Sequence, residues 1–304
     1  MRETATTPHV RPMVLAVGCV RAARPRQWVK NLLVLAAPAL GGALEQRQGV
    51  INALVALVAF TMASAGTYLI NDARDVKADR LHPVKRERPV AAGVVPVKFA
   101  YGLGGALMAG ALVLGVLTLP AAFTGVLAGY VAITLAYQAG AKDIPIWELG
   151  IVAAGFVLRL IAGGAATGTP LSSWFLIVGG GAAFYVVVTK RKAEIGEMSD
   201  EAYAHRPSLA GYTPDMLLMA QAATLGVTLT AYALWAFTDA VPGGTSAWLE
   251  VSIVPLFLGM LRLGQQAEIL RVSAPEELLL RDTQMIGFGI LWLALVIIGL
   301  GGVA

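Results

Sequence analysis

Residues 71–89 read NDARDVKADRLHPVKRERP, a segment with four acidic and six basic side chains in nineteen positions. It lies between two apolar stretches, 50–70 and 98–118, each long enough to cross a bilayer as a helix. Over the whole chain 57% of residues are hydrophobic and only 14% are charged, whereas about a quarter are charged in an average soluble protein. These properties predict an all-α polytopic membrane protein with a dense charged loop after its second span.

Apolar stretches recur along all 304 residues, so we expect one transmembrane domain over 1–304, with 1–27 as a cytoplasmic N-terminal segment. A helix needs roughly 17–25 apolar residues to cross the hydrocarbon core. We place nine spans around a central cavity that opens to the cytoplasm. They are 30–47, 50–70, 98–118, 121–139, 147–167, 172–190, 215–237, 247–264 and 285–303.

The distribution of Lys and Arg predicts the orientation. With the N-terminus inside, 21 of the 23 Lys and Arg residues fall in cytoplasmic segments, while Arg47 lies in an outer loop and Arg159 within a span. Because cytoplasmic loops carry an excess of positive charge, we expect a cytoplasmic N-terminus and an outer C-terminus. We also expect a multi-pass protein of the plasma membrane whose active site faces the cytoplasm. The net charge is only +4, so nucleic acid is not an expected partner. The single cysteine excludes an internal disulfide.

The charged segment has the side chains of a magnesium site. If the helix of the second span continues through Asp79, its polar side chains repeat at intervals of three and four residues and share one face. Carboxylates on one face repel each other unless a cation binds, and hard oxygen ligands suit Mg²⁺, whose coordination substrate phosphates can complete. We predict that Asn71, Asp72 and Asp75 hold Mg²⁺. We also predict that Asp72, Asp75 and Asp79 act in catalysis.

Cationic residues around this motif are predicted to bind phosphate groups. Lys85 and Arg88 lie in a proline-bounded loop that can fold over the metal. Lys190 and Arg191 directly follow the sixth span. Arg159 lies within a span, where a charge is costly and usually faces a cavity or a partner. The predicted substrate-binding residues are Lys30, Tyr68, Lys85, Arg88, Arg159, Lys190, Arg191 and Glu194.

The pattern Asn-Asp-x-x-Asp-x-x-x-Asp at 71–79 resembles the first signature of the UbiA superfamily of intramembrane prenyltransferases. Nine helices and a second charged cluster after the sixth span are also similar to that superfamily. In typical members the second cluster is another Asp-rich motif, which helps to hold a second Mg²⁺ on a prenyl diphosphate. Here it reads KRKAE at 190–194 and is basic. A basic cluster would bind phosphate directly and would hold a second metal poorly.

Four motifs together resemble one branch of the superfamily, the decaprenyl-phosphate phosphoribosyltransferases. They are RPRQWVKN at 24–31, the segment 71–93 that ends in RPVAAG, KRKAE at 190–194, and PEEL at 275–278 with Arg281 and Asp282. The resemblance implies Mg²⁺-dependent transfer of 5-phosphoribosyl from 5-phosphoribosyl 1-diphosphate to polyprenyl (decaprenyl) phosphate, with release of diphosphate. The product of such a reaction leads to the arabinan (arabinogalactan) of the cell wall.

Two other functions remain open. An ordinary prenyltransferase would move a polyprenyl group from its diphosphate to an aromatic acceptor, and the basic second cluster argues against it. A membrane transporter would carry charges in the middle of several spans, but only Arg159 is clearly so placed. For Tyr68 an interfacial anchor, and for Arg159 a structural pairing, are open alternatives. The oligomeric state is not fixed by the sequence, which is compatible with a homo-oligomer.

Overall fold

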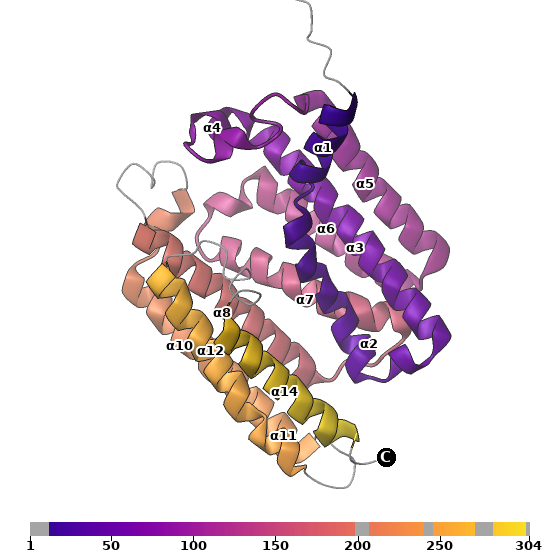
Figure 1. Ribbon diagram of the computed structural model, residues 1–304, viewed down its shortest axis with the longest axis vertical. Coiled ribbons are helices and arrows are strands. Elements are labelled where there is room, and N and C mark those ends of the chain that lie inside the picture. Colours follow the sequence, from indigo (N-terminus) through magenta and orange to yellow (C-terminus); the bar gives the residue numbers. More distant parts are fainter. Residues whose placement is uncertain (1–11, 198–206, 240–245, 271–281, 302–304) are drawn as a thin grey trace, which may run out of the picture. The chain divides into compact units, whose positions relative to one another are not determined.

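The computed structural model describes residues 12–197, 207–239, 246–270 and 282–301, and every regular element in these ranges is a helix (Figure 1). The chain divides into two compact units. Unit 1 comprises Met1–Gln138 and Leu158–Pro170, and unit 2 comprises Ala139–Val157 and Leu171–Ala304. The expectation of a single domain over 1–304 stays a prediction.

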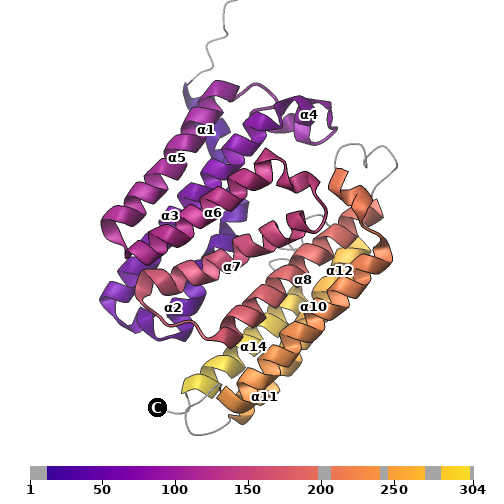
Figure 2. The ribbon, with the colours of Figure 1, turned by 180° about the vertical axis from the view of Figure 1, so that it is seen from behind.

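Unit 1 begins with short helical elements and continues with long helices. Two of the long helices, α3 and α5, lie side by side (Figure 2). The second half of α7 (Trp147–Thr167) completes the unit. In chain order its other elements are α1 (Pro12–Ala22), the 3₁₀ helix η1 (Pro25–Leu35), α2 (Ala36–Leu40), the 3₁₀ helix η2 (Ala43–Glu45), α3 (Arg47–Arg74), α4 (Val76–Leu81), the 3₁₀ helix η3 (Lys85–Glu87), α5 (Val97–Thr118) and α6 (Ala121–Ala139).

Glycine lets the backbones of α3 and α5 touch. A Cβ atom at Gly66 would lie 2.5 Å from the carbonyl oxygen of Gly104, and a Cβ at Gly104 would lie 2.9 Å from the carbonyl oxygen of Gly66. Between apolar helices in lipid the hydrophobic effect contributes little, so close packing of this kind drives association. Next to this contact, Phe60, Phe123 and Leu127 form a fully buried core between α3 and α6.

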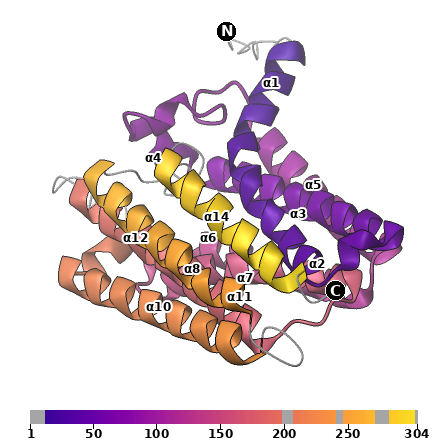
Figure 3. The same ribbon diagram turned by 60° about the horizontal axis from the view of Figure 1, so that its bottom comes forward.

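Unit 2 is built mainly from α8, α10, α12 and α14, and α12 contacts the other three (Figure 3). The sequence determines where α10 begins. Pro214 is its first residue, and the hydroxyl of the preceding Thr213 accepts the Met216 N–H at 3.2 Å as an N-cap. The elements are η4 (Ala141–Asp143), the first half of α7, α8 (Ser173–Glu197), η5 (Pro207–Gly211), α10 (Pro214–Leu234), the π-helical turn η6 (Trp235–Asp239), α11 (Ala247–Val251), α12 (Ile253–Leu270) and α14 (Thr283–Gly301).

Within the described ranges, eight helical segments are long and apolar enough to cross a membrane. They are Arg47–Arg74, Val97–Thr118, Ala121–Ala139, Trp147–Thr167, Ser173–Ile195, Pro214–Thr238, Ala247–Ile269 and Thr283–Leu300. They confirm the all-α membrane class, and each coincides with one of the nine expected spans. The central cavity stays a prediction.

The expected first span, 30–47, is not one continuous helix. It is divided among η1, α2, η2 and the start of α3. The chain turns at Gly42, whose φ of 70° lies in the left-handed region that glycine adopts readily. Hydropathy alone cannot report such breaks, because it averages composition over a window. The expectation that this segment crosses the membrane stays a prediction.

The α3–α5 contact gives a first prediction. Gly104→Ala should lower the free energy of unfolding by about 1–3 kcal/mol, because the new methyl group meets backbone that cannot move aside. Gly105→Ala is the matched control, because a Cβ at Gly105 meets nothing within 4 Å. Thermal unfolding of both purified variants in detergent measures the difference. Equal melting temperatures would show that this contact is not tight.

Candidate functional site

The charged motif begins in the last turn of α3, which ends at Arg74. Asp75, with φ −84° and ψ 6°, separates α3 from α4, so the expectation of one helix through Asp79 is wrong. The one-turn spacing nevertheless persists, because the Asp75 N–H donates to the Asn71 carbonyl at 2.9 Å and the Asp79 N–H donates to the Asp75 carbonyl at 2.8 Å. Asp72 and Asp79 are buried, whereas Asn71 and Asp75 are half-buried.

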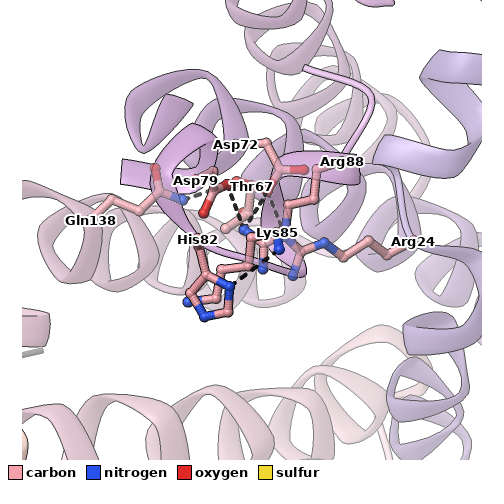
Figure 4. Close-up of polar contacts among 8 residues, drawn as sticks. All are labelled: Arg24, Thr67, Asp72, Asp79, His82, Lys85, Arg88 and Gln138. Atoms are coloured by element: carbon pink, nitrogen blue, oxygen red, sulfur yellow. Dashed lines mark hydrogen bonds and ion pairs between the residues drawn. The ribbon is translucent and has the colours of Figure 1, made fainter. Parts of the chain in front are cut away.

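Two arginines hold the buried carboxylates (Figure 4). Arg24 Nη2 lies 2.5 Å from Asp72 Oδ1. Arg88 Nη1 lies 2.7 Å from Asp79 Oδ2 and 3.4 Å from the same Asp72 oxygen. Both aspartate side chains are at most 5% exposed, and the arginines are 29% and 27% exposed. The result is a chain of alternating charge, Arg24–Asp72–Arg88–Asp79, which we call the Arg–Asp chain.

The remaining polar positions of the motif determine what metal it suits. Among the described residues, no three His, Cys, Asp or Glu side chains converge as a metal site. Asn71 and Asp75, one helical turn apart, present an amide and a carboxylate oxygen. Mg²⁺ is usually bound through one or two carboxylates, with water and substrate phosphate completing the octahedron. This pair of donors fits such an ion, provided that a phosphate supplies the rest.

Other predicted residues lie around the Arg–Asp chain. The guanidinium of Arg24 lies 4.8 Å above the centre of the Tyr68 ring. Lys30 is half-buried on η1, and Lys85 is exposed at the start of η3. The backbone N–H groups of Val84 and Lys85 donate to His82 Nδ1 at 3.2 and 3.3 Å. His82 therefore shapes the loop that carries Lys85.

Arg24 is a site residue that the sequence prediction missed. It stands just before η1 with φ 53° and ψ 65°, a left-handed conformation that is uncommon for residues other than glycine. Such strain persists only where surrounding contacts over-determine it, as at functional sites. Its place in the motif at 24–31 was the available signal, but proximity to Asp72, 48 positions away, is not visible in the sequence.

Arg159 lies inside unit 1. Its Nε donates to Asn31 Oδ1 at 2.9 Å, and its Nη2 donates to the Tyr130 hydroxyl at 3.1 Å. The guanidinium also lies 4.8 Å from the Tyr130 ring centre and 5.7 Å from that of Phe60. The Asn31 amide in turn donates to Thr61 and Ser64 on α3. These contacts give Arg159 a structural pairing, and its predicted role in substrate binding stays untested.

In unit 2, Arg191 is buried against two carboxylates. Its Nε and Nη2 each lie 2.5 Å from an oxygen of Glu148, and its Nη1 donates to Glu194. Glu148 is fully buried, whereas the Lys190 side chain is a third exposed and its Nζ lies 4.0 Å from Glu194. The second cluster is therefore divided: Arg191 faces the protein interior, and Lys190 is the more accessible cation.

Tyr212 extends this buried cluster and was also missed. Its hydroxyl accepts the Ile146 N–H at 2.7 Å and lies 3.4 Å from Glu148 Oε1. Burial raises the pKa of the Tyr212 phenol, so the group stays protonated at neutral pH. Ile146 itself has φ 67°, and the hydrogen bond helps to hold that strained turn before α7.

The late motif is only partly visible. Pro275–Leu278 and Arg281 lie outside the described residues. Asp282 accepts the Met285 N–H at 2.9 Å at the start of α14 and pairs with Arg262 Nη2 at 2.8 Å. Hydrogen bonds from Arg262 and then from Met285 lower the pKa of Asp282. Its observed contacts are those of a helix cap that ties α14 to α12.

Comparison with known proteins identifies the family. Residues 32–277 match the UbiA prenyltransferase family. The chain belongs to this family. As a UbiA-family protein it is a multi-pass membrane enzyme of the transferase class.

Individual relatives cover nearly the whole chain. The decaprenyl-phosphate phosphoribosyltransferase of Corynebacterium glutamicum is 39% identical over 290 residues, which span 92% of this chain and 86% of the relative. The protein of the same name from Mycolicibacterium smegmatis is 39% identical over 293 residues, which span 93% and 92%. A UbiA homolog from Archaeoglobus fulgidus, solved bound to GPP and Mg²⁺, superposes with a TM-score of 0.68 at 18% identity over 93% of this chain and 98% of that one. The similarity to the Archaeoglobus fulgidus structure shows that the two proteins share a fold.

The Arg–Asp chain leads to a prediction about stability. Asp72→Asn should lower the free energy of unfolding by about 3 kcal/mol, because Arg24 and Arg88 lose the buried charge that they share. Glu87→Gln, an exposed acid in the same loop, should change it by less than about 0.5 kcal/mol. Reversible unfolding in mixed micelles measures both. Equal losses in the two variants would contradict a special role for Asp72.

The Glu148–Arg191 pair leads to a second stability prediction. Glu148→Gln should cost about 3–5 kcal/mol, because it leaves the buried Arg191 with one carboxylate fewer. The double variant Glu148→Gln/Arg191→Gln should be less destabilised than the sum of the single variants. Lys192→Gln is the control, because its pairing with the exposed Glu268 at 3.1 Å should contribute no more than about 1 kcal/mol. Strict additivity in the double variant would refute the coupling.

Proposed function

We propose that this protein transfers 5-phosphoribosyl from 5-phosphoribosyl 1-diphosphate to a polyprenyl phosphate, with decaprenyl phosphate as the natural acceptor. The observation that carries the proposal is the 39% identity, over more than nine-tenths of this chain, to relatives named decaprenyl-phosphate phosphoribosyltransferase. The fold and the charged motif are compatible with it. The arrangement of the site suggests a role for each residue.

The donor's diphosphate matches the end of α3. We assign Asn71 and Asp75, two of the three metal ligands that the sequence predicted, to a Mg²⁺ ion. We give the third, Asp72, the role of holding Arg24 and Arg88. When bound, this ion would neutralise the diphosphate as it leaves. Arg88 and Lys85 would bind diphosphate oxygens, with Arg88 aimed by Asp72 and Asp79. Those two carboxylates would thus serve catalysis by positioning cations.

Bond making requires little acid–base chemistry. An oxygen of the lipid phosphate attacks C1 of the ribose, and the bond from C1 to the diphosphate oxygen breaks with its electron pair leaving on diphosphate. The attacking phosphate is already an anion near neutral pH, so no strong general base is required. Positioning of the two substrates and neutralisation of the leaving group would supply most of the rate enhancement.

The remaining cations are assigned to the other phosphate groups. The donor also carries a 5-phosphate, and we place Lys30 and Tyr68 near the ribose and this group. We assign Lys190 to direct phosphate contact, with Glu194 and Arg191 as its support. Arg159 is our candidate for the lipid phosphate, with Asn31 and Tyr130 holding its guanidinium.

The second cluster separates this reaction from ordinary prenyl transfer. Glu194 is its one carboxylate, and this group contacts both Lys190 and Arg191. A second divalent ion there would have to displace two cations, which like-charge repulsion opposes. We place the site at the cytoplasmic face of the plasma membrane, where the water-soluble donor is available, and connect the product to cell-wall arabinan synthesis.

Transfer of label tests the reaction. Purified protein is incubated with ribose-labelled 5-phosphoribosyl 1-diphosphate, polyprenyl phosphate and Mg²⁺, and organic-extractable label is counted. We expect labelled lipid that disappears when either Mg²⁺ or the acceptor is omitted. Absence of labelled lipid, together with transfer from a prenyl diphosphate to an aromatic acceptor, would replace the proposal by ordinary prenyl transfer.

The metal assignment gives a variant prediction. Asp75→Ala should reduce transfer by more than about 100-fold, since loss of even an outer partner of a metal ligand costs 10–100-fold. It should also weaken Mg²⁺-dependent donor binding in calorimetry without preventing membrane insertion. Lys77→Gln, an exposed neighbour on α4, should retain activity within a few-fold. Unchanged activity of Asp75→Ala would remove Asp75 from the metal site.

A further inference from the structure

Arg191 divides its nitrogen donors between two carboxylates of unit 2. Its Nε and Nη2 each lie 2.5 Å from one oxygen of Glu148, so Glu148 binds this guanidinium in a bidentate manner. Its Nη1 donates to Oε2 of Glu194. The other Glu194 oxygen, Oε1, lies 4.0 Å from Lys190 Nζ. Charges of alternating sign therefore follow one another as Glu148–Arg191–Glu194–Lys190, which we call the Glu–Lys chain.

Burial decreases steadily along the Glu–Lys chain. The side chain of Glu148 is 0% exposed, that of Arg191 3%, that of Glu194 12% and that of Lys190 33%. The buried end is enclosed by protein, whereas the ammonium at the outer end can be reached by a ligand. A side chain fixed at the inner end can thus influence the position of a cation at the outer end.

Glu148 is itself held by a strained turn. It lies in the first turn of α7, and Ile146, two residues earlier, has φ 67°, which is rare for a β-branched residue. The Tyr212 hydroxyl accepts the Ile146 N–H at 2.7 Å, and its own proton can donate to Glu148 Oε1, 3.4 Å away. A Cβ at the adjacent Gly211 would lie 2.4 Å from Pro145 Cγ, so a larger residue would clash with that ring. These contacts fix the turn that presents Glu148.

Stability alone does not explain this arrangement. Replacing a buried ion pair by packed apolar side chains of similar volume is often neutral or stabilising. The backbone strain at Ile146 is a further cost, and such strain is typical of functional sites. A role in positioning accounts for both costs, because the Glu–Lys chain begins in the protein interior and ends at an accessible ammonium.

We propose that Glu148 is a positioning residue that sets where the Lys190 ammonium lies. Because Glu148 engages Nε and Nη2 of Arg191, this guanidinium does not pair with both oxygens of Glu194, and Oε1 is left to Lys190. Without the Glu148 charge, Arg191 would turn to Glu194, and Lys190 would lose its carboxylate. Tyr212 supports the arrangement by orienting Glu148. The consequence for substrate binding rests on the proposed function, in which Lys190 contacts a phosphate, whereas the positioning of Lys190 does not.

The reactivity of the Lys190 amine tests the positioning without any catalysis. Purified protein in detergent is treated with a limiting amount of an amine-specific acylating reagent, and modification of Lys190 is measured by mass spectrometry relative to the exposed Lys77. In Glu148→Gln, Lys190 should react about threefold faster or more, because its ion pair is lost. Glu268→Gln is the matched control, since it releases Lys192 on the same helix and should leave the Lys190 rate unchanged.

An unchanged Lys190 rate in Glu148→Gln, or an equal rise in Glu268→Gln, would overturn the proposal. Tyr212→Phe provides a gentler variant, because it removes one hydroxyl and keeps both the ring and the Glu148 charge. Its Lys190 rate should rise in the same direction by a smaller factor. Should Glu148→Gln fail to give folded protein in size-exclusion chromatography, an unchanged Lys190 rate in Tyr212→Phe would overturn the proposal instead.

Kinetics test the consequence for substrate binding. Lys190→Gln should raise one of the two KM values, for donor or for acceptor, by about tenfold or more with kcat nearly unchanged, because a hydrogen bond to a charged phosphate is lost. Glu148→Gln should raise the same KM, and the double variant should be no worse than Lys190→Gln alone. Additive effects would show that Glu148 does not act through Lys190. If the wild-type protein transfers no label, the proposed function fails, while the reactivity of Lys190 still decides the positioning.

Discussion

A buried carboxylate at the end of a long apolar helix is the constraint on which the site depends. Asp72 belongs to the last turn of α3 and is almost fully enclosed, so its charge must be matched inside the protein. Arg24 reaches it from the segment before η1, and Arg88 reaches it from the loop beyond α4. One charge thus ties three distant segments together. The need to compensate the Asp72 charge explains why segment 75–88 folds back toward the end of α3. It also explains why the start of η1 lies there.

Two other arginines are buried in the part of the chain that the structure describes, and their charges are compensated in different ways. Arg191 is matched by the carboxylates of Glu148 and Glu194 and joins α8 to the start of α7. Arg159 is held by the amide of Asn31 and the hydroxyl of Tyr130, and its guanidinium lies beside the rings of Tyr130 and Phe60. In a medium of low dielectric each arrangement fixes a guanidinium within a narrow range of positions. The phosphate chemistry that we propose uses cations held in place before the substrate arrives.

Much of this organisation could be predicted from sequence, and the exceptions come from local backbone geometry and from contacts between residues far apart in the sequence. Eight spans and the Asp motif follow from composition and local spacing. The division of the expected first span into η1, α2 and η2 did not, because hydropathy averages composition over a window. The break at Asp75 depends on a single ψ angle. The pairs Arg24–Asp72 and Glu148–Arg191 join residues more than 40 positions apart, so only the folded chain reveals them. We predicted that Arg191 binds a phosphate because its pairing with Glu148, 43 positions away, is not visible in the sequence.

The number of metal ions bound with the donor tests the account most directly. Mn²⁺ can replace Mg²⁺, and electron paramagnetic resonance counts the ions bound per chain when the donor is added. We predict one bound ion per chain, because the basic second cluster would repel a second divalent ion. We also predict that Asn71→Ala loses this ion. Two spin-coupled ions per chain would contradict the assignment of roles and favour the two-metal arrangement of an ordinary prenyltransferase.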